Sequence, residues 1–417
     1  MAWSDGGPCY RPGMRDVTAG QRRALVTRRH HLAGDATGPD EVARCLVGLH
    51  ATDPATPYLS VLARGHGATI DDVQTAMYER RSLVRWMAMR RTLFVFPVET
   101  VPVVQAAASR PLAATLRRQL VNRLARNGSV PPVEGDIGEW IESVGEGAHA
   151  ALVELGSATG AQLGAAEPRL RTLIPPRAKS DLPQNVTASL LVVMSCEARM
   201  VRGTATGAWT ARQHRWEPLE RWWPSGLPDL GTPDAQVALV RAWLEAFGPA
   251  PVSDIEWWTG WTKAGVRAAL NGLPLAEVSL DGAPGVMLDE PLAHRGLDEA
   301  AIEAAAGSGA DAPVVTLLPA LDPTPMGYKT RDWFTAVDLA LLYDRNGNLG
   351  PTLWCDGEIV GGWAIAPGGE VRVRVVAERG AAVAEAASRA AAALQARLGG
   401  ATVTPVFRTA LERALTA

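Results

Sequence analysis

The sequence contains few cysteines, no long apolar run and no signal peptide. Its four cysteines, Cys9, Cys45, Cys196 and Cys355, are far apart and form no Cys-x-x-Cys pair. This spacing argues against zinc ribbons, iron–sulfur clusters and a disulfide scaffold. No run of roughly 18 apolar residues could span a bilayer, and the first residues lack the charged-then-apolar pattern of a secretory signal. We therefore expect a cytoplasmic protein that is neither exported nor embedded in a membrane.

The chain also carries almost no net charge. The chain has 41 Lys and Arg against 44 Asp and Glu, so no global basic field indicates a nucleic-acid partner, and any such partner must contact a local patch. Arginines do gather within residues 80–91 and 117–126. They could be solvated salt-bridge partners on helix faces or contacts to phosphates, and both interpretations remain open. The histidines show no ligand spacing, so we expect no metal and no organic cofactor.

The composition that remains is that of a folded globular protein. Hydrophobic residues make up 47% of the 417 residues and charged residues 20%, which indicates two or three domains, each with its own core. Apolar periodicity predicts helices at 17–33, 40–50 and 54–64, with another near 70–80. The segment "SLVRWMAMRRTLFVFP" then predicts one or two strands that stop at Pro97. Helices followed by a β-ribbon are typical of a winged helix.

The same order recurs twice more along the chain. It is seen at 145–217 and again from Ala235, where Thr262 is expected to start the last helix before the hairpin. Short strands then follow from about 312, with an Ala-rich helix at 380–398 and a last helix near 406–416. We predict an α+β protein with three tandem winged-helix units at 1–130, 138–228 and 233–310, then an α+β module at 311–417. Pro- and Gly-rich stretches at 128–137 and 173–184 are the expected linkers.

The stretch "CLVGLHATDPATPYLSVLAR", residues 45–64, places polar side chains between two apolar helical runs. In one interpretation His50 satisfies the carbonyls at a helix end and Asp53 caps the next helix, ahead of Pro54. In the other, the imidazole of His50, the hydroxyl of Thr52 and the Asp53 carboxylate together orient and deprotonate a water.

This stretch resembles a pattern of the AlkZ/YcaQ-type winged-helix DNA glycosylases. "GLHATDPATPYLSVLAR" keeps the frame of their "GLQAQDP…YL…AR", whose Gln-x-Gln or Gln-x-Asp pair is catalytic. Four further segments resemble family signatures in the same order: "VRWMAMRRTLFVFP", "GPAPVSDIEWWTGWTKAGVRAAL", "LLPALDPTPMGYKTRDWF" and "PTLWCDGEIVGGW". The resemblance covers nearly the whole chain and implies a concave DNA-binding channel.

The resemblance also implies roles for individual residues. His50 and Thr52 occupy the positions of the catalytic pair and would hold and activate the attacking water, while Asp53 caps the helix or, as the lesser alternative, supports catalysis. Arg91 replaces a family glycine and Phe94 a family histidine, changes that suit a bulky, flat adduct. The expected contacts to DNA come from the first ribbon, the second wing and the "GYKTRDW" segment: Arg90, Arg91, Arg199, Arg202, Tyr328, Lys329 and Arg331.

The implied activity is that of a monofunctional, monomeric DNA glycosylase. It would hydrolyse the N-glycosidic bond of bulky N7-alkylguanine adducts or crosslinks in double-stranded DNA, for genotoxin self-resistance or for repair. No catalytic lysine accompanies the motif, so no lyase step is expected. Three alternatives stay open at this point: a winged-helix transcription regulator, a DNA-binding protein that has lost hydrolysis, and a carrier that binds the genotoxin itself.

Overall fold

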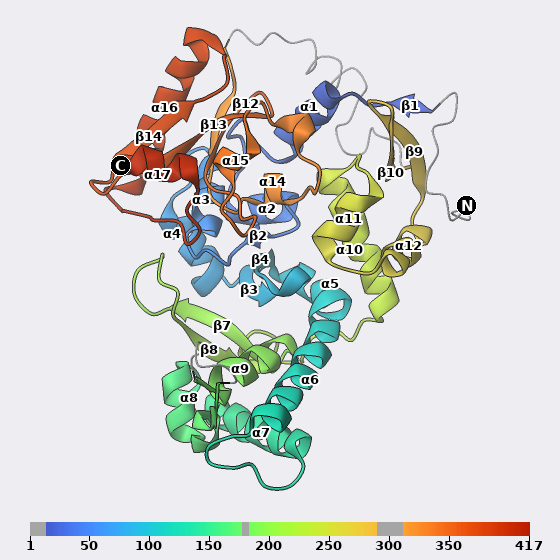
Figure 1. The fold of residues 1–417 in the computed structure, drawn as a ribbon, viewed down its shortest axis with the longest axis vertical. Helices are drawn as coiled ribbons and strands as arrows, with labels where there is room; N and C mark the ends of the chain where they lie inside the picture. Colours follow the sequence, from blue (N-terminus) through green and yellow to red (C-terminus); the bar gives the residue numbers. More distant parts are fainter. Residues whose placement is uncertain (1–13, 177–182, 290–311) are drawn as a thin grey trace.

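The computed structural model describes residues 14–176, 183–289 and 312–417. Helices and strands are interspersed along these ranges, as the mixed α and β prediction requires. Residues 137–218 lie at one end of the molecule's long axis, and the long helix α6 (Arg110–Asn127) connects them to the rest (Figure 1). None of the helices in the described ranges combines the length and apolar character that a membrane span requires.

The first unit is built from short helices that pack on a three-stranded sheet. Helix α1 (Ala19–Arg29) precedes it and starts at a capping box made by Thr18 and Gln21. Strand β2 pairs with β4, which pairs with β3, all antiparallel. The elements of the unit are α2 (Pro39–Cys45), β2 (Leu49–His50), α3 (Thr56–Arg64), α4 (Ile70–Gln74), η1 (Thr75–Glu79), β3 (Leu83–Met87), η2 (Met89–Arg91) and β4 (Leu93–Pro97).

The second unit has the same order of elements and its own core. Capping side chains start two of its helices: Asp136 at α7, and Thr159 at α8 through a capping box. The segments α5 (Val101–Val104), η4 (Gln105–Ser109) and α6 lead into it. Its elements are α7 (Ile137–Leu155), α8 (Gly160–Ala166), η5 (Pro168–Arg171), β5 (Leu173–Ile174), β6 (Gln184–Asn185), α9 (Val186–Cys196), β7 (Met200–Ala205), β8 (His214–Pro218) and η6 (Leu219–Arg221).

The third unit repeats the order once more. Thr262 caps its last helix, as predicted, by accepting a hydrogen bond from the Gly265 amide. Strand β1 (Arg15–Asp16), from the start of the described chain, pairs in parallel with β9, so this segment joins the third sheet rather than the first. The elements are α10 (Thr232–Phe247), α11 (Val252–Thr259), α12 (Lys263–Asn271), β9 (Leu275–Leu280) and β10 (Ala283–Leu288).

One pairing detail is common to all three units. The residues between the first and second helices form a short extended segment that pairs with the second strand of the hairpin. This pairing is β2 with β4 in the first unit, Ala158 with Trp216 in the second, and Ala250 with Val286 in the third. The first and second sheets are further joined by a single register pair between β3 and β7, which makes a five-stranded sheet of order β2-β4-β3-β7-β8.

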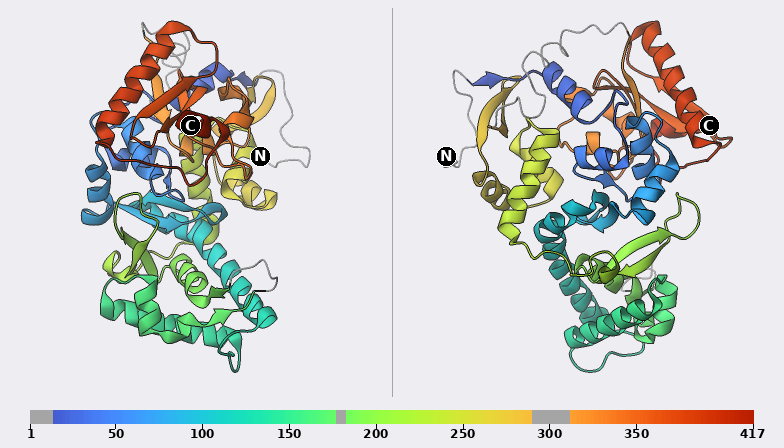
Figure 2. Two further views of the ribbon diagram at one scale, coloured as in Figure 1. Left: turned by 60° about the vertical axis from the view of Figure 1, so that its left-hand side comes forward. Right: turned by 180° about the vertical axis from the view of Figure 1, so that it is seen from behind.

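The C-terminal module is a four-stranded antiparallel sheet of order β11-β12-β13-β14 covered by helix α16. It packs against α3 of the first unit, and Figure 2 shows the two side by side from further directions. Its elements are β11 (Val315–Leu318), α14 (Pro323–Met326), η8 (Asp332–Phe334), α15 (Leu339–Leu342), β12 (Thr352–Cys355), β13 (Glu358–Ile365), β14 (Val371–Val375), α16 (Gly380–Leu398) and α17 (Ala410–Thr416).

A buried ion pair fastens this module to the first unit. The Arg64 guanidinium donates to both carboxylate oxygens of Asp322, at 2.8 and 2.7 Å, and both side chains are fully buried. Ser60 donates to the same carboxylate at 2.7 Å. The two residues come from the "YLSVLAR" and "LLPALDP" segments, so one contact links two of the motifs that the sequence displays separately.

Several element boundaries differ from the sequence prediction. The predicted helix 40–50 ends at Cys45, and the helix predicted from residue 54 starts at Thr56. The stretch 173–184 is not a linker between units: its described part forms β5 and β6 inside the second unit, and 177–182 lie outside the described residues. The predicted end of the third unit and the first residue of the C-terminal module likewise fall within 290–311, outside the described residues.

Candidate functional site

His50 lies on the short strand β2, in register with Phe94 of β4. Only 7% of the residue is exposed, and its ring meets the Phe94 ring edge-on at 5.2 Å between centroids. The Nδ1 atom is buried and has no hydrogen-bond partner. The interpretation that His50 satisfies helix-end carbonyls is therefore wrong, because the helix ends five residues earlier and the ring nitrogen bonds to none of its carbonyls.

The surroundings of His50 keep its imidazole neutral at physiological pH. Burial, which disfavours the charged form, and to a smaller extent the Arg90 guanidinium lower the pKa of His50 to about 4, although the Asp322 carboxylate partly opposes the shift. A neutral imidazole has one ring nitrogen that can accept a proton. His50 therefore has the state that a proton acceptor needs.

Thr52 and Asp53 differ sharply in what they contact. Thr52 is exposed, and its hydroxyl bonds to none of the described residues. Asp53 is only 4% exposed, and its two carboxylate oxygens accept the amides of Ala55, at 3.0 Å, and Val406, at 2.8 Å. Thr52 is thus available to a ligand, whereas the contacts of Asp53 fix the turn before α3 and the chain that precedes α17.

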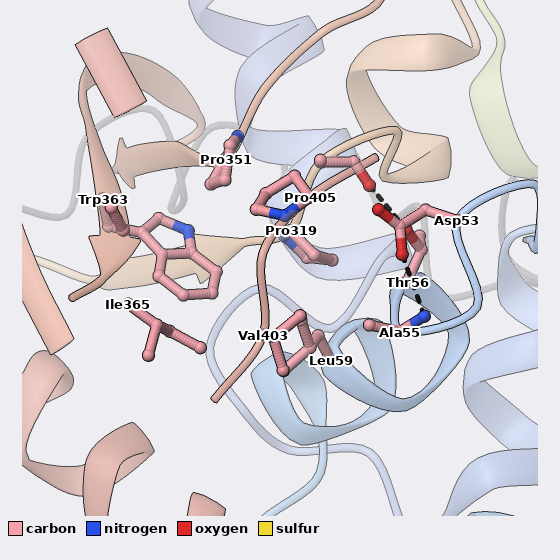
Figure 3. A pocket seen from close by; sticks show the side chains of 12 residues that line it. Asp53, Ala55, Thr56, Leu59, Pro319, Pro351, Trp363, Ile365, Val403 and Pro405 are labelled. Carbon is pink, nitrogen blue, oxygen red and sulfur yellow. Dashed lines mark hydrogen bonds between the residues drawn. The ribbon is translucent and has the colours of Figure 1, made fainter. Parts of the chain in front are cut away.

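A small cavity behind Asp53 is not large enough for a nucleobase. It lies between α3 and the C-terminal sheet, with Leu59 and Trp363 among its lining residues (Figure 3). Its volume is about 10 Å³, the space of about one water molecule. The cavity belongs to the joint between the two units, and the carboxylate of Asp53 is held there by the amides already described.

Arg90 and Arg331, distant in sequence, both contact the same indole, that of Trp257. The Arg90 guanidinium carbon lies 4.3 Å from the Trp257 ring centroid, and that of Arg331 lies 4.9 Å from the same ring. Arg331 also lies 5.2 Å from the Tyr343 ring. Cation–π contacts hold a guanidinium in place without neutralising its charge. Neither arginine forms an ion pair with any carboxylate in the described part of the chain, and Arg331 Nη2 is buried without a partner.

Arg91 is exposed beside this stack and has an unusual backbone. The hairpin turn between β3 and β4 puts Arg90 and Arg91 in the left-handed region, with φ of 55° and 59°. Glycine adopts this conformation at little cost, whereas other residues are strained in it. This strain explains why glycine suits the position of Arg91 in the pattern that the sequence resembles. An arginine at this position lowers the stability of the fold.

The "GYKTRDW" segment divides between interior and surface. Tyr328 is 1% exposed and its hydroxyl donates to the Phe247 carbonyl at 2.8 Å, so the predicted DNA contact of Tyr328 is replaced by a packing role. Lys329 is exposed. The loop is held by Asp254, one of whose carboxylate oxygens accepts the amides of Lys329 and Thr330. Burial raises the pKa of Asp254, and its other oxygen is buried without a partner.

The second wing does not present its arginines as expected. Arg202 is 8% exposed, lies 4.5 Å from the Trp216 ring and donates to His214 Nε2 at 2.7 Å. Arg199 forms an ion pair with Glu142 at 3.0 Å. The arginines of α6 also follow the salt-bridge interpretation in part, since Arg117 contacts both Glu142 and Glu197. These side chains lie inside the protein or have carboxylate partners.

No sequence pattern indicated that Trp257, Arg85 or Arg22 has a special environment. Trp258 is buried, whereas the adjacent Trp257 is only partly buried. Arg22 lies 3.8 Å from the Trp333 ring, and its Nε and Nη2 atoms are buried without partners. Only tertiary contacts distinguish these residues from other Trp and Arg. In the described ranges, no group of three or more His, Cys, Asp or Glu is placed to hold a metal ion.

The site therefore combines a neutral imidazole, a free hydroxyl and arginines without carboxylate partners. The imidazole can accept a proton, the hydroxyl can hold a water, and the arginines can bind an anion such as a phosphate. His50 and Arg90 are close enough for the charge of one to affect the other. Of the residues predicted from the sequence, the structure thus gathers His50, Arg90 and Arg331 through their electrostatic contacts.

Comparisons with known proteins identify the family of the chain. The chain matches a family model described as DNA glycosylase AlkZ-like over residues 43–413. Among solved structures it is similar to the Streptomyces sahachiroi DNA glycosylase AlkZ, with a TM-score of 0.65 and 18% sequence identity over 94% of this chain and 99% of that one. A search of curated proteins finds no match. The family model spans most of the chain, and the protein is therefore a member of the AlkZ-like DNA glycosylase family.

Proposed function

We propose that this protein is a monofunctional glycosylase for bulky N7-alkylguanine adducts or crosslinks in double-stranded DNA. The observation that carries the proposal is the neutral His50 beside the exposed Thr52 and the unpaired Arg90. Monomeric action, with a role in genotoxin self-resistance or repair, belongs to the same proposal. The three units of helix, short strand, two helices and hairpin support an arrangement of three tandem winged helices around a DNA-binding channel.

The proposed reaction needs little from the leaving group. Alkylation at N7 makes the purine cationic, so the C1′–N9 bond breaks with its electron pair leaving on the base, which departs neutral. Water forms the new bond to C1′ and gives its proton to a ring nitrogen of His50, which passes it to solvent. Thr52 accepts or donates a hydrogen bond to hold that water.

The arginines serve the same reaction by binding the strand. Arg90 and Arg331, stacked on Trp257, would bind phosphates near the damaged nucleotide, and the exposed Arg91 and Lys329 would extend this surface. Because burial and, to a smaller extent, the charge of Arg90 lower the pKa of His50, strand binding and proton acceptance are joined in one place. Phe94, against the His50 ring, gives an apolar wall that suits a flat adduct better than a polar residue would.

The test measures abasic-site formation in duplexes that carry one defined N7-alkylguanine, with either a bulky group or a methyl group at N7. Abasic sites are detected by strand cleavage with mild alkali. We expect His50→Ala to slow the reaction about 100-fold or more, Thr52→Ala to slow it less, and His50→Gln to retain part of the rate. His66→Ala, at an exposed histidine, is the matched control. An unchanged rate in His50→Ala would remove His50 from the mechanism.

Other outcomes distinguish the remaining functions. Binding of one undamaged sequence by a dimer, with no abasic sites from any adduct, would identify a transcription regulator instead. Binding of the alkylating compound in the absence of DNA would identify a carrier.

A further inference from the structure

Two arginines lie directly opposite each other at the seam between the first and second units. Arg85 of β3 and Arg202 of β7 form the register pair that joins the two sheets. Residues paired in register on antiparallel strands project from the same face, with their side chains adjacent. Two cationic side chains therefore lie next to each other on one face of the five-stranded sheet.

Both cations are withdrawn from solvent and lack a counter-charge. Arg85 is 6% exposed and Arg202 is 8% exposed. The Nε and Nη2 atoms of Arg85 and the Nε atom of Arg202 are buried without hydrogen-bond partners. Neither side chain forms an ion pair with a carboxylate in the described residues.

The groups around the pair are polar but neutral. The Tyr58 hydroxyl lies against both Arg85 and Tyr78, and burial raises the pKa of Tyr58, so that it stays protonated. His214 is neutral as well, because burial and the Arg202 charge lower its pKa to about 3. The hydroxyl oxygens of Tyr58 and Tyr78 are buried and have no hydrogen-bond partner. These side chains supply further donors and no negative charge.

Like charges directly opposite on a sheet destabilise it, and a buried charge without a partner costs free energy. Apolar side chains of the same size would fill this space at lower cost. An anion that receives hydrogen bonds from both guanidiniums would remove the cost, and phosphate matches the planar donor array of arginine. We propose that Arg85 and Arg202, with the hydroxyls of Tyr58 and Tyr78, form a binding site for a phosphate group.

Under the proposed function, on which this part of the inference rests, the phosphate belongs to the DNA backbone. The hairpin tip between β7 and β8 lies beside the site, since the ring of Trp209 in that tip is 5.1 Å from the Tyr58 ring. The strand pairing of β7 with β8 becomes irregular directly after Arg202. The proposal requires the tip to move away from Tyr58 when a backbone phosphate enters, and the irregular pairing lets this happen with the Arg85–Arg202 pair still in register.

The first experiment uses inorganic phosphate and needs no glycosylase activity. Thermal melting of the full chain is measured with increasing phosphate, at an ionic strength held constant with chloride. We expect phosphate to raise the melting temperature of the wild type. Arg85→Met and Arg202→Met should abolish that rise, and each should melt at or above the wild-type temperature without phosphate. Arg118→Met, at an exposed arginine of α6, should keep the rise.

The second experiment separates DNA from free phosphate as the source of the ligand. Binding to an undamaged duplex is measured over a range of salt concentrations, and each lost phosphate contact should lower the slope of log K against log salt by about 1. We expect this loss in Arg85→Met and Arg202→Met and not in Arg118→Met. If both variants lost the phosphate-dependent rise in melting temperature but kept the slope of log K against log salt, the assignment of the phosphate to DNA would be overturned.

The whole proposal is overturned if both variants keep the phosphate-dependent rise, or if both melt far below the wild type, because the pair would then stabilise the fold itself. Failure of adduct hydrolysis with these phosphate results intact would contradict the proposed function and leave the phosphate site standing.

Discussion

Two groups of arginines in this protein differ in their partners. In the first group each guanidinium has a carboxylate, whether fully buried, as Arg64 with Asp322, or largely exposed, as Arg44 with Glu99. The second group has no carboxylate among the described residues and meets aromatic rings, hydroxyls or an imidazole instead: Arg22, Arg85, Arg90, Arg202 and Arg331.

The difference separates arginines whose charge is balanced by a carboxylate from arginines whose charge is not. A guanidinium with a carboxylate partner has its charge balanced inside the protein, so it adds little to the binding of another anion. A guanidinium stacked on a ring is fixed in place with its charge and part of its donor set unused. Counting arginines in the sequence could not make this distinction, because partners such as Asp322 of Arg64 and Glu99 of Arg44 lie far away along the chain.

The largest effect should come from breaking the buried pair. Arg64→Met leaves the Asp322 carboxylate buried without its cation, which should lower the free energy of unfolding by roughly 3–5 kcal/mol. Arg44→Met is the matched control, because its pair with Glu99 is more than half exposed and should be worth at most about 1 kcal/mol. Urea denaturation measures both, and equal losses in the two variants would contradict the distinction.

Acid should destabilise the fold by protonating histidines of the unfolded chain that are neutral and lie near arginines in the folded protein. Burial and the adjacent arginine lower the pKa of His50 to about 4 and of His214 to about 3, and burial and Arg64 lower that of His30 to about 3. The unfolded chain binds protons near pH 6.5, before the folded one does, so stability should be lost as pH falls from about 6.5 towards 4.

Thermal melting between pH 7.5 and 4.5 measures this loss, which should be smaller in His50→Gln. Activity on adducted DNA, if His50 is the proton acceptor, should stay level above about pH 5 and fall as pH approaches 4. An activity that falls with a midpoint near pH 6.5 would show that His50 is not protected by its surroundings.

The sequence predicted the order of the elements much better than the environment of the site. The strand end at Pro97, the cap at Thr262 and the helix at 380–398 were correct because each depends on local chemistry: proline ends a strand, threonine caps, and an alanine-rich amphipathic run forms a helix. The helix predicted to reach His50 was wrong because β2 pairs with β4, more than forty residues away. No local pattern reports such a tertiary pairing.

The sequence likewise predicted which residues to consider for the site but not their tertiary contacts. The motif frame located His50 and Thr52, but it could not show that Asp53 is held by the distant amide of Val406 or that Tyr328 is buried. The roles of His50 and Thr52 stay predictions until the adduct assay is done. Arg90 and Arg331 illustrate the limit most clearly, since both were predicted to bind DNA, while the indole that both contact comes from a third segment.

Removing an unpaired arginine should weaken DNA binding without weakening the fold. Arg331→Met should lower the affinity for duplex DNA about ten-fold at low salt, or roughly 1.4 kcal/mol, because one stacked guanidinium is lost. Arg110→Met, whose arginine pairs with the exposed Asp229, should leave the affinity unchanged. Fluorescence anisotropy with a labelled duplex gives both affinities, and an equal decrease in the two variants would show that pairing does not decide which arginines bind.

The smallest effect should come from Arg91, where stability and binding are expected to move in opposite directions. Arg91→Gly relieves the left-handed backbone, whose strain of about 1–2 kcal/mol is offset in part by the greater freedom of glycine in the unfolded chain. We expect a gain in stability of at most about 1 kcal/mol, together with weaker DNA binding. Arg81→Gly relieves a similar backbone, φ 53°, outside the predicted interface, so it should leave binding unchanged, and Arg91→Lys should keep both the strain and the binding. If Arg91→Gly bound DNA as tightly as the wild type, the strained arginine would need another explanation than its charge.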